Sequence, residues 1–119
     1  MGKLDDKVAL ITGGVSGLGR STARRFIEEG ASVVIADIDS QKGKSAEEEL
    51  STLGGDVAFL EIDVTDEASQ ARVFQETIER FAKLDVVLAG AGISSASYVL
   101  AKLTKEARIQ KVIFCSINR

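Results

Sequence analysis

Short apolar runs rich in β-branched residues alternate along the chain with longer segments whose apolar residues recur at helical spacing. This alternation is typical of βαβ units, in which helices cover both faces of a parallel sheet. The runs are almost continuously apolar, as expected for strands that are buried on both faces. The predicted strands are residues 7–12, 32–37, 56–62, 84–89 and 111–116.

Four helices are predicted between these strands, each following a glycine turn or a residue type that favours a helix N-terminus. Gly30 has the position of a C-terminal cap for the first helix. The predicted helices are residues 17–29, a segment from Asp39 or Ser40 to Gly54 and Gly55, a segment beginning at Thr65 or Asp66, and a segment from Ser94 or Ser95 to about residue 108.

Two of these helices have an apolar stripe that should face the sheet. Because βαβ crossovers are right-handed, we expect an α/β fold with a three-layer, doubly wound, Rossmann-type parallel sheet in the order 3-2-1-4-5. Residues 1–119 are predicted to form a single domain. The stripe residues are Leu18, Thr22, Ala23, Phe26 and Ile27 in the first helix, and Ala71, Phe74, Ile78 and Phe81 in the third.

Composition changes this picture only by exclusion. The 119 residues carry a net charge of -3, which favours neither nucleic acid nor an anionic membrane as a partner. Histidine is absent and Cys115 is the single cysteine, so we expect no metal site and no histidine-dependent hydrolase. No apolar run nears the roughly 20 residues of a membrane span, and the N-terminus lacks the apolar core of a secretion signal. We therefore expect a cytoplasmic protein.

Three glycines, Gly13, Gly17 and Gly19, lie where the first predicted strand gives way to the first helix. Glycine tolerates the positive φ values of such a turn and has no side chain to obstruct a pyrophosphate. The N–H groups at the start of the helix would then face that anion. The pattern favours a dinucleotide site, and the alternative is a glycine-rich turn without a ligand.

Asp37 ends the second predicted strand, 18 residues beyond Gly19. A carboxylate there can accept hydrogen bonds from ribose hydroxyls and would repel a 2′-phosphate, so it favours NAD over NADP. Asp39 adds to that repulsion. The alternative reading of Asp37 is a solvated acid at a strand end. Arg20 and Arg24 would favour NADP, although positions on the solvent face of the first helix explain them equally well.

Residues 12–19 resemble the glycine pattern TGxxxGxG of the short-chain dehydrogenase/reductase family, because Thr12 and the three glycines match each fixed position. Residues 4–11 are similar to the first strand of that family. Residues 84–93 resemble the stretch that usually ends in Asn-Asn-Ala-Gly, with Ala89 and Gly90 in place of the asparagines. The resemblance covers about residues 3–94, and residues 95–119 are predicted to be a closing helix-strand unit of uncertain origin.

The resemblance implies a cofactor site for NAD, with NADP as the weaker alternative. Asp63 and Val64 resemble the Asp-Val pair of the family, whose aspartate binds the adenine amino group. The residues implied in cofactor binding are Gly13, Val15, Ser16, Gly17, Leu18, Gly19, Asp37, Ile38, Asp63, Val64, Ala89, Gly90, Ala91 and Gly92.

The catalytic residues of the family are not found at their expected places. Members carry a serine after the fifth strand and a Tyr-x-x-x-Lys pair on the following helix. Here Tyr98 and Lys102 have that spacing but follow the fourth strand, and Ser116 lies nearer the expected serine position. These three residues are weak catalytic candidates. Alternatively, residues 104–118 are a disturbed copy of the fourth helix of the family, with Asn118 as its asparagine.

Three functions follow from these observations. The first is an NAD(H)-binding domain that resembles the N-terminal half of a short-chain dehydrogenase/reductase, truncated or engineered, without the full Ser-Tyr-Lys set. The second is a working NAD-dependent dehydrogenase or reductase that acts on an alcohol or carbonyl compound. The third is a flavodoxin-like scaffold without a cofactor. We expect a monomer or a small homo-oligomer, with the dinucleotide as its partner.

Overall fold

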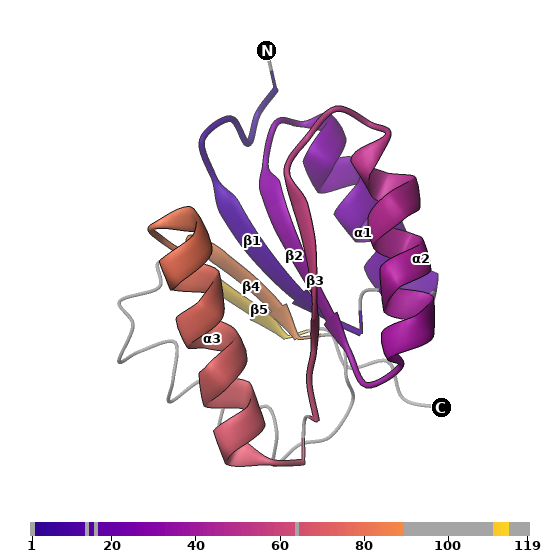
Figure 1. Cartoon of the computed structure of the whole chain (residues 1–119). Coiled ribbons are helices and arrows are strands. Elements are labelled where there is room, and N and C mark those ends of the chain that lie inside the picture. Colours follow the sequence, from indigo (N-terminus) through magenta and orange to yellow (C-terminus); the bar gives the residue numbers. More distant parts are fainter. Residues whose placement is uncertain (1, 14, 16, 64, 90–110, 115–119) are drawn as a thin grey trace.

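The computed structural model describes residues 2–13, 15, 17–63, 65–89 and 111–114. Within them, five parallel strands form a sheet in the order β3-β2-β1-β4-β5, which confirms the predicted fold and strand order (Figure 1). The strands are β1 (Val8–Thr12), β2 (Ser32–Asp37), β3 (Val57–Glu61), β4 (Val86–Ala89) and β5 (Lys111–Phe114), and the helices are α1 (Gly17–Glu28), α2 (Ser40–Ser51) and α3 (Glu67–Phe81).

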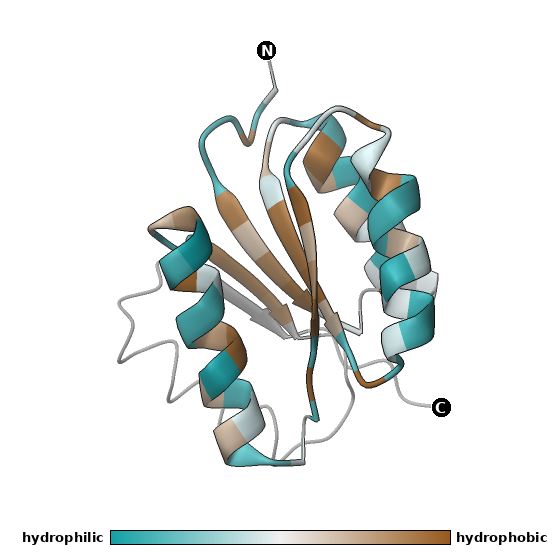
Figure 2. Cartoon of the chain, viewed as in Figure 1, coloured by the Kyte–Doolittle hydropathy of each residue, from teal (hydrophilic) through white to brown (hydrophobic). Residues whose placement is uncertain are grey.

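Helices α1 and α2 cover one face of the sheet and α3 covers the other (Figure 1). Alternate side chains of the central strand β1 point to opposite faces of the sheet. Val8 and Leu10 pack in the core under α3, whereas Ala9 and Ile11 pack in the core under α1 and α2. Figure 2 shows the result, with apolar strands inside and polar helix surfaces outside. Burial of a Leu or Ile side chain contributes roughly 1.5–3 kcal/mol, so both cores hold the layers together.

Several element ends differ from the prediction by a few residues. Of the two predicted caps of α2, Asp39 is the N-cap, because its carboxylate accepts a hydrogen bond from Lys42 N at 3.0 Å. The same helix ends at Ser51, before the predicted glycine pair. At the C-terminal end of α2, the Thr52 amide donates to carbonyls of the last helical turn. Strand β4 begins two residues later than predicted, and the predicted helix over residues 94–108 lies outside the described residues.

The buried face of α3 is also rotated relative to the predicted stripe. Thr77 enters the core because its hydroxyl donates to Val73 O at 2.7 Å, so the polar side chain is satisfied inside the helix. Ala71 is only half-buried, and Ile78 and Phe81 pack at the edge of the core. The fully buried residues are Gln70, Val73, Phe74 and Thr77. In α1 the stripe is centred on Ala23 and Ile27, with Thr22 and Phe26 partly buried.

Asp85 fixes β4 against β1. Its backbone N–H donates to Val8 O at 2.9 Å, and its carboxylate accepts from Val8 N at 2.9 Å. Lys83 lies 3.2 Å from the same carboxylate oxygen. This arrangement sets the register that places Ala89 opposite Thr12 at the far ends of the two strands.

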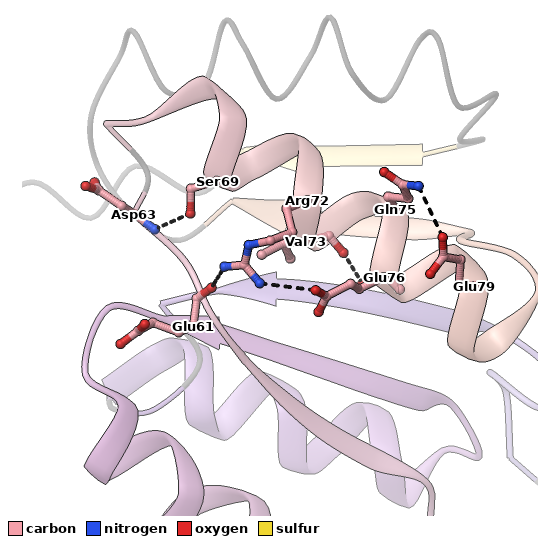
Figure 3. Close-up of polar contacts among 9 residues, drawn as sticks. Glu61, Asp63, Ser69, Arg72, Val73, Gln75, Glu76 and Glu79 are labelled. Carbon is pink, nitrogen blue, oxygen red and sulfur yellow. Dashed lines mark hydrogen bonds and ion pairs between the residues drawn. The ribbon is translucent and has the colours of Figure 1, made fainter.

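The outer edge of β3 is closed by side chains from both neighbouring helices. In the ladder with β2, residues 57, 59 and 61 direct their backbone polar groups outward. Glu47 of α2 accepts from Phe59 N at 2.7 Å, and Arg72 of α3 donates to Glu61 O at 2.7 Å (Figure 3). An open edge strand is a template for pairing with another chain, and charged groups on the edge prevent it.

Among the described residues, the helices lack the combination of length and apolar character that a membrane crossing needs.

Replacing Gly43 with alanine should destabilise the protein, although alanine favours a helix more than glycine does. Gly43 is buried in α2, and a β-carbon there would lie 2.1 Å from a ring carbon of Phe59. Overpacking costs about 1–3 kcal/mol, more than the roughly 1 kcal/mol that alanine contributes to a helix. Urea unfolding should therefore show a lower free energy of unfolding for Gly43→Ala.

The exposed neighbour Lys44 supplies the matched control, because Lys44→Ala changes the same helix without a clash. The decrease in the free energy of unfolding caused by Gly43→Ala should be smaller when Phe59 is also replaced by leucine. A Gly43→Ala protein as stable as the parent would show that α2 does not approach β3 this closely.

Removing both edge side chains, by Glu47→Ala with Arg72→Ala, should promote self-association. In the unmodified protein each of these side chains hydrogen-bonds a backbone group of β3, and such charged hydrogen bonds contribute about 1.5–3 kcal/mol. Each substitution leaves that backbone group without its partner. Sedimentation should show concentration-dependent dimers or larger species. The control pair Glu48→Ala with Arg80→Ala removes the same charges from exposed positions of the same helices. Equal association by the two double variants would contradict the protective role.

Candidate functional site

The carboxyl ends of the neighbouring strands β2, β1 and β3 meet at one edge of the sheet. Thr12 of β1 is aligned with Ala36 of β2, and Ala36 is aligned with Leu60 of β3. The predicted site residues Gly13, Asp37 and Asp63 follow or end these strands, so the fold brings them to the same edge. Ligands of open parallel sheets bind at this edge.

The chain leaves β1 through a turn at Gly13, whose φ of 73° lies in the left-handed region. Its N–H donates to Ala36 O at 2.7 Å and so extends the pairing of β1 with β2. Gly13 therefore provides the turn, whereas its amide is already used by the sheet. Val15 is buried in the core under α1 and α2, so packing accounts for its side chain.

Helix α1 starts directly after this turn, at Gly17. Among the described residues, a β-carbon built on Gly17 would meet no atom within 4 Å outside the adjacent residues and the backbone of its own helix, and the residue has a φ of +58°. The first turn of α1 holds no acidic residue, whereas α2 and α3 are capped by Asp39 and Asp66. The amides of a first helical turn have no partner inside the helix. The start of α1 can therefore accommodate an anion.

Asp37 is the last residue of β2, and its carboxylate has a defined orientation. Its Oδ1 accepts a hydrogen bond from Asp39 N at 3.1 Å. Its backbone carbonyl accepts from Ile62 N at 3.0 Å, which ties the strand end to β3. The next residue, Ile38, is 66% exposed, which is unusual for a large apolar side chain. An acceptor and an apolar surface thus lie side by side after β2.

Asp63, just beyond β3, is fixed by hydrogen bonds at its amide and one carboxylate oxygen. Its N–H donates to Ser69 Oγ at 2.9 Å, and its carboxylate points away from Ser69 (Figure 3). Thr65 donates to its Oδ1 twice, from Oγ1 at 2.5 Å and from N at 2.9 Å. The Thr65 hydroxyl, followed by the Thr65 amide, lowers the pKa of Asp63 from its ordinary value of 3.8. The carboxylate is therefore an acceptor only.

The roles of Thr65 and Ser69 beside Asp63 are not predicted from the sequence. Of the two predicted caps of α3, Thr65 and Asp66, the structure uses Asp66, whose carboxylate accepts from Ala68 N at 3.1 Å. The available signal was the spacing, since an aspartate often accepts a hydrogen bond from the backbone two residues later.

The two arginines of α1 that would favour NADP both have acidic neighbours. Arg20 forms an ion pair with Glu49 of α2, and Arg24 lies 3.6 Å from Glu28. A cleft of about 370 Å³ between α1 and α2 is lined by Gly17, Arg20, Ser21, Arg24, Glu49 and Leu50.

Three further predicted site residues lie in described elements. Leu18 and Gly19 lie in the first turn of α1, and Ala89 ends β4. Cys115 and the alternative Asn118 lie outside the described residues, whereas residues 111–114 form a strand, as predicted. The other predicted site residues outside the described part are Ser16, Val64, Gly90, Ala91, Gly92, Tyr98, Lys102 and Ser116.

Comparison with known proteins identifies relatives along most of the chain. A 2,5-dichloro-2,5-cyclohexadiene-1,4-diol dehydrogenase of Sphingobium indicum is 46% identical over 91 residues, which are 76% of this chain and 36% of that protein. A 3beta-hydroxysteroid dehydrogenase of Mediterraneibacter gnavus is 35% identical over 118 residues, 99% of this chain and 42% of that protein. The chain thus spans less than half the length of these relatives.

A solved structure shares the fold. The short chain dehydrogenase from Mycobacterium smegmatis superposes with a TM-score of 0.86 at 26% identity, over 90% of this chain and 54% of that one. The sequence pattern of the family described as short chain dehydrogenase matches residues 7–118, which includes much of the segment after residue 94. The chain therefore belongs to the short chain dehydrogenase family.

Proposed function

We propose that this chain binds NAD(H) across the carboxyl ends of β1, β2 and β3. Short chain dehydrogenases are oxidoreductases that bind a nicotinamide dinucleotide. The observation that carries the choice of NAD is the position of Asp37, an oriented carboxylate beside the turn at Gly13. The other features of the site fit the same ligand from the pyrophosphate to the adenine.

The pyrophosphate would lie at the start of α1. Gly17 leaves open space where any other residue would place a β-carbon. The first-turn amides of the helix and the positive end of its dipole favour a negative group there. Because Gly13 N is bonded to Ala36 O, the amides after the turn, rather than that of Gly13, would contact the phosphates.

The adenosine would lie over the ends of β2 and β3. Asp37 would accept hydrogen bonds from the ribose hydroxyls through the oxygen that Asp39 N does not hold. Ile38 would pack against the adenine, which explains why a large apolar side chain stays 66% exposed. Asp63 would accept from the amino group of the base, as the family resemblance implies.

Charge favours NAD over NADP at this site. A 2′-phosphate would approach the carboxylates of Asp37 and Asp39, and like charges repel. The nearby cations do not offset this repulsion, because Glu49 pairs with Arg20 and Glu28 lies beside Arg24.

Bound NAD(H) would supply hydride transfer, and this chain would supply binding and orientation of the cofactor. Tyr98, Lys102 and Ser116 stay predictions as catalytic residues. The single domain, the cytoplasmic location, the monomeric or small homo-oligomeric state and a truncated origin also stay predictions. The dehydrogenase activities of the longer relatives are not assigned to this chain.

Fluorescence titration should show NADH binding more tightly than NADPH, and Asp37→Ala should reverse or abolish that preference. Loss of hydrogen bonds to a charged group weakens binding by about 1.5–3 kcal/mol, so NADH affinity should fall roughly 10- to 100-fold. NADPH affinity should stay the same or rise. Asp56→Ala is the matched control, because it removes one exposed carboxylate at the opposite end of the sheet.

A preference for NADPH in the unmodified chain would contradict the assignment to Asp37. If neither cofactor bound below millimolar concentration, the flavodoxin-like scaffold would be the better description.

Gly17→Ala should weaken NADH binding strongly, whereas Gly54→Ala should not. Both glycines have positive φ, +58° and +88°, and beyond their adjacent residues and local helix backbone neither has a described atom within 4 Å of an added β-carbon. The strain of about 1–2 kcal/mol should therefore be similar in the two variants. Gly54 lies in the connection from α2 to β3, at the opposite end of the sheet.

Thermal unfolding should show equal losses of stability for the two variants. NADH titration should show weaker binding for Gly17→Ala than for Gly54→Ala. Equal affinity for NADH would show that no phosphate lies against Gly17.

A further inference from the structure

We propose that Thr65 is a positioning residue that makes this site specific for a base with an exocyclic amino group. The inference rests on the proposed NAD(H) site, in which Asp63 faces the adenine. It concerns Thr65 itself, which holds one oxygen of Asp63 and leaves the other oxygen to the ligand.

The first step is the geometry around Asp63. Thr65 Oγ1 and Thr65 N both donate to Oδ1, at 2.5 Å and 2.9 Å. The amide of Asp63 donates to Ser69 Oγ at 2.9 Å, and its carbonyl accepts from Asp66 N at 3.0 Å. The backbone on both sides of the side chain is thus fixed, and Oδ1 is committed to Thr65.

The second step is the direction of the remaining oxygen. The carboxylate points away from Ser69 (Figure 3). Thr65 is exposed and Asp63 is only half-buried, so the group can be reached from solution. Oδ2 of Asp63 therefore offers an acceptor in a defined position at the carboxyl end of the sheet.

The third step is the chemistry of that acceptor. The hydroxyl of Thr65 stabilises the ionised carboxylate and holds the pKa of Asp63 below its ordinary value. An ionised carboxylate accepts hydrogen bonds and donates none. It accepts a hydrogen bond from the amino group at position 6 of adenine, whereas a purine without that amino group offers no donor there. Because its two hydrogen bonds to Oδ1 orient this acceptor, Thr65 contributes to base selection without contacting the ligand.

The test compares NADH with reduced nicotinamide purine dinucleotide, in which a hydrogen atom replaces the amino group at position 6 of the base. The unmodified chain should bind NADH about tenfold more tightly. Thr65→Val, which keeps the branched shape and removes the hydroxyl, should lower this ratio towards one. Thr65→Ser, which keeps the hydroxyl, should preserve it, and Thr65→Ala should match Thr65→Val.

Thr52→Val is the matched control. Thr52 Oγ1 donates to Glu49 O at 2.6 Å at the C-terminal end of α2. The variant therefore loses a hydroxyl at a helix end, away from the carboxyl ends of the strands. Its base preference should be unchanged. Carboxyl-carbon NMR gives an independent measurement: the titration of Asp63 should move to higher pH in Thr65→Val and stay in place in Thr65→Ser.

The outcomes separate this inference from the proposed function. If the unmodified chain binds neither dinucleotide, the NAD(H) site itself is wrong. If it binds NADH but Thr65→Val keeps the tenfold ratio, or if valine and serine variants behave alike, the positioning role is overturned. Equal binding of both dinucleotides by the unmodified chain overturns it as well, because Asp63 would then make no contact with the amino group.

Discussion

The pairing of β1 with both of its neighbours is the constraint on which the site depends. On the side of β2, Gly13 N donates to Ala36 O. On the side of β4, Asp85 N donates to Val8 O, and the Asp85 carboxylate accepts from Val8 N. These bonds fix where β1, β2 and β4 end relative to one another. A shift in this register would move Asp37 away from the turn at Gly13. The chemistry of the site is thus set by main-chain hydrogen bonds before any functional side chain contributes.

The same local device orients both acids at this edge. Asp37 accepts from the backbone N–H of residue 39, and Asp63 accepts from that of residue 65. In each case one carboxylate oxygen is held by the chain itself. The turns after two neighbouring strands therefore present two acceptors in fixed directions, and preorganised acceptors need no ordering when a ligand binds.

The sequence predicted what depends on local pattern and missed what depends on packing. The continuous apolar run of β1 sufficed for the fold, and the glycines and Asp37 could be predicted to meet at the carboxyl end of the sheet. Burial of Gln70 and Thr77 was not predictable from polarity, because it depends on how α3 lies against the sheet. The contact of Gly43 with Phe59 likewise exists only after α2 has docked.

Thr65 lies between these two cases. Its hydrogen bonds are local, but a side chain that holds another side chain leaves no periodic signal in the sequence. Its position two residues after Asp63 can be seen in the sequence. Whether Thr65 caps α3 or binds Asp63 depends on Asp66, which is the N-cap of α3. Because the cap is filled by a neighbour, the hydroxyl of Thr65 is available to Asp63. The helix N-terminus and the oriented acid are therefore products of one arrangement of Asp63, Thr65 and Asp66.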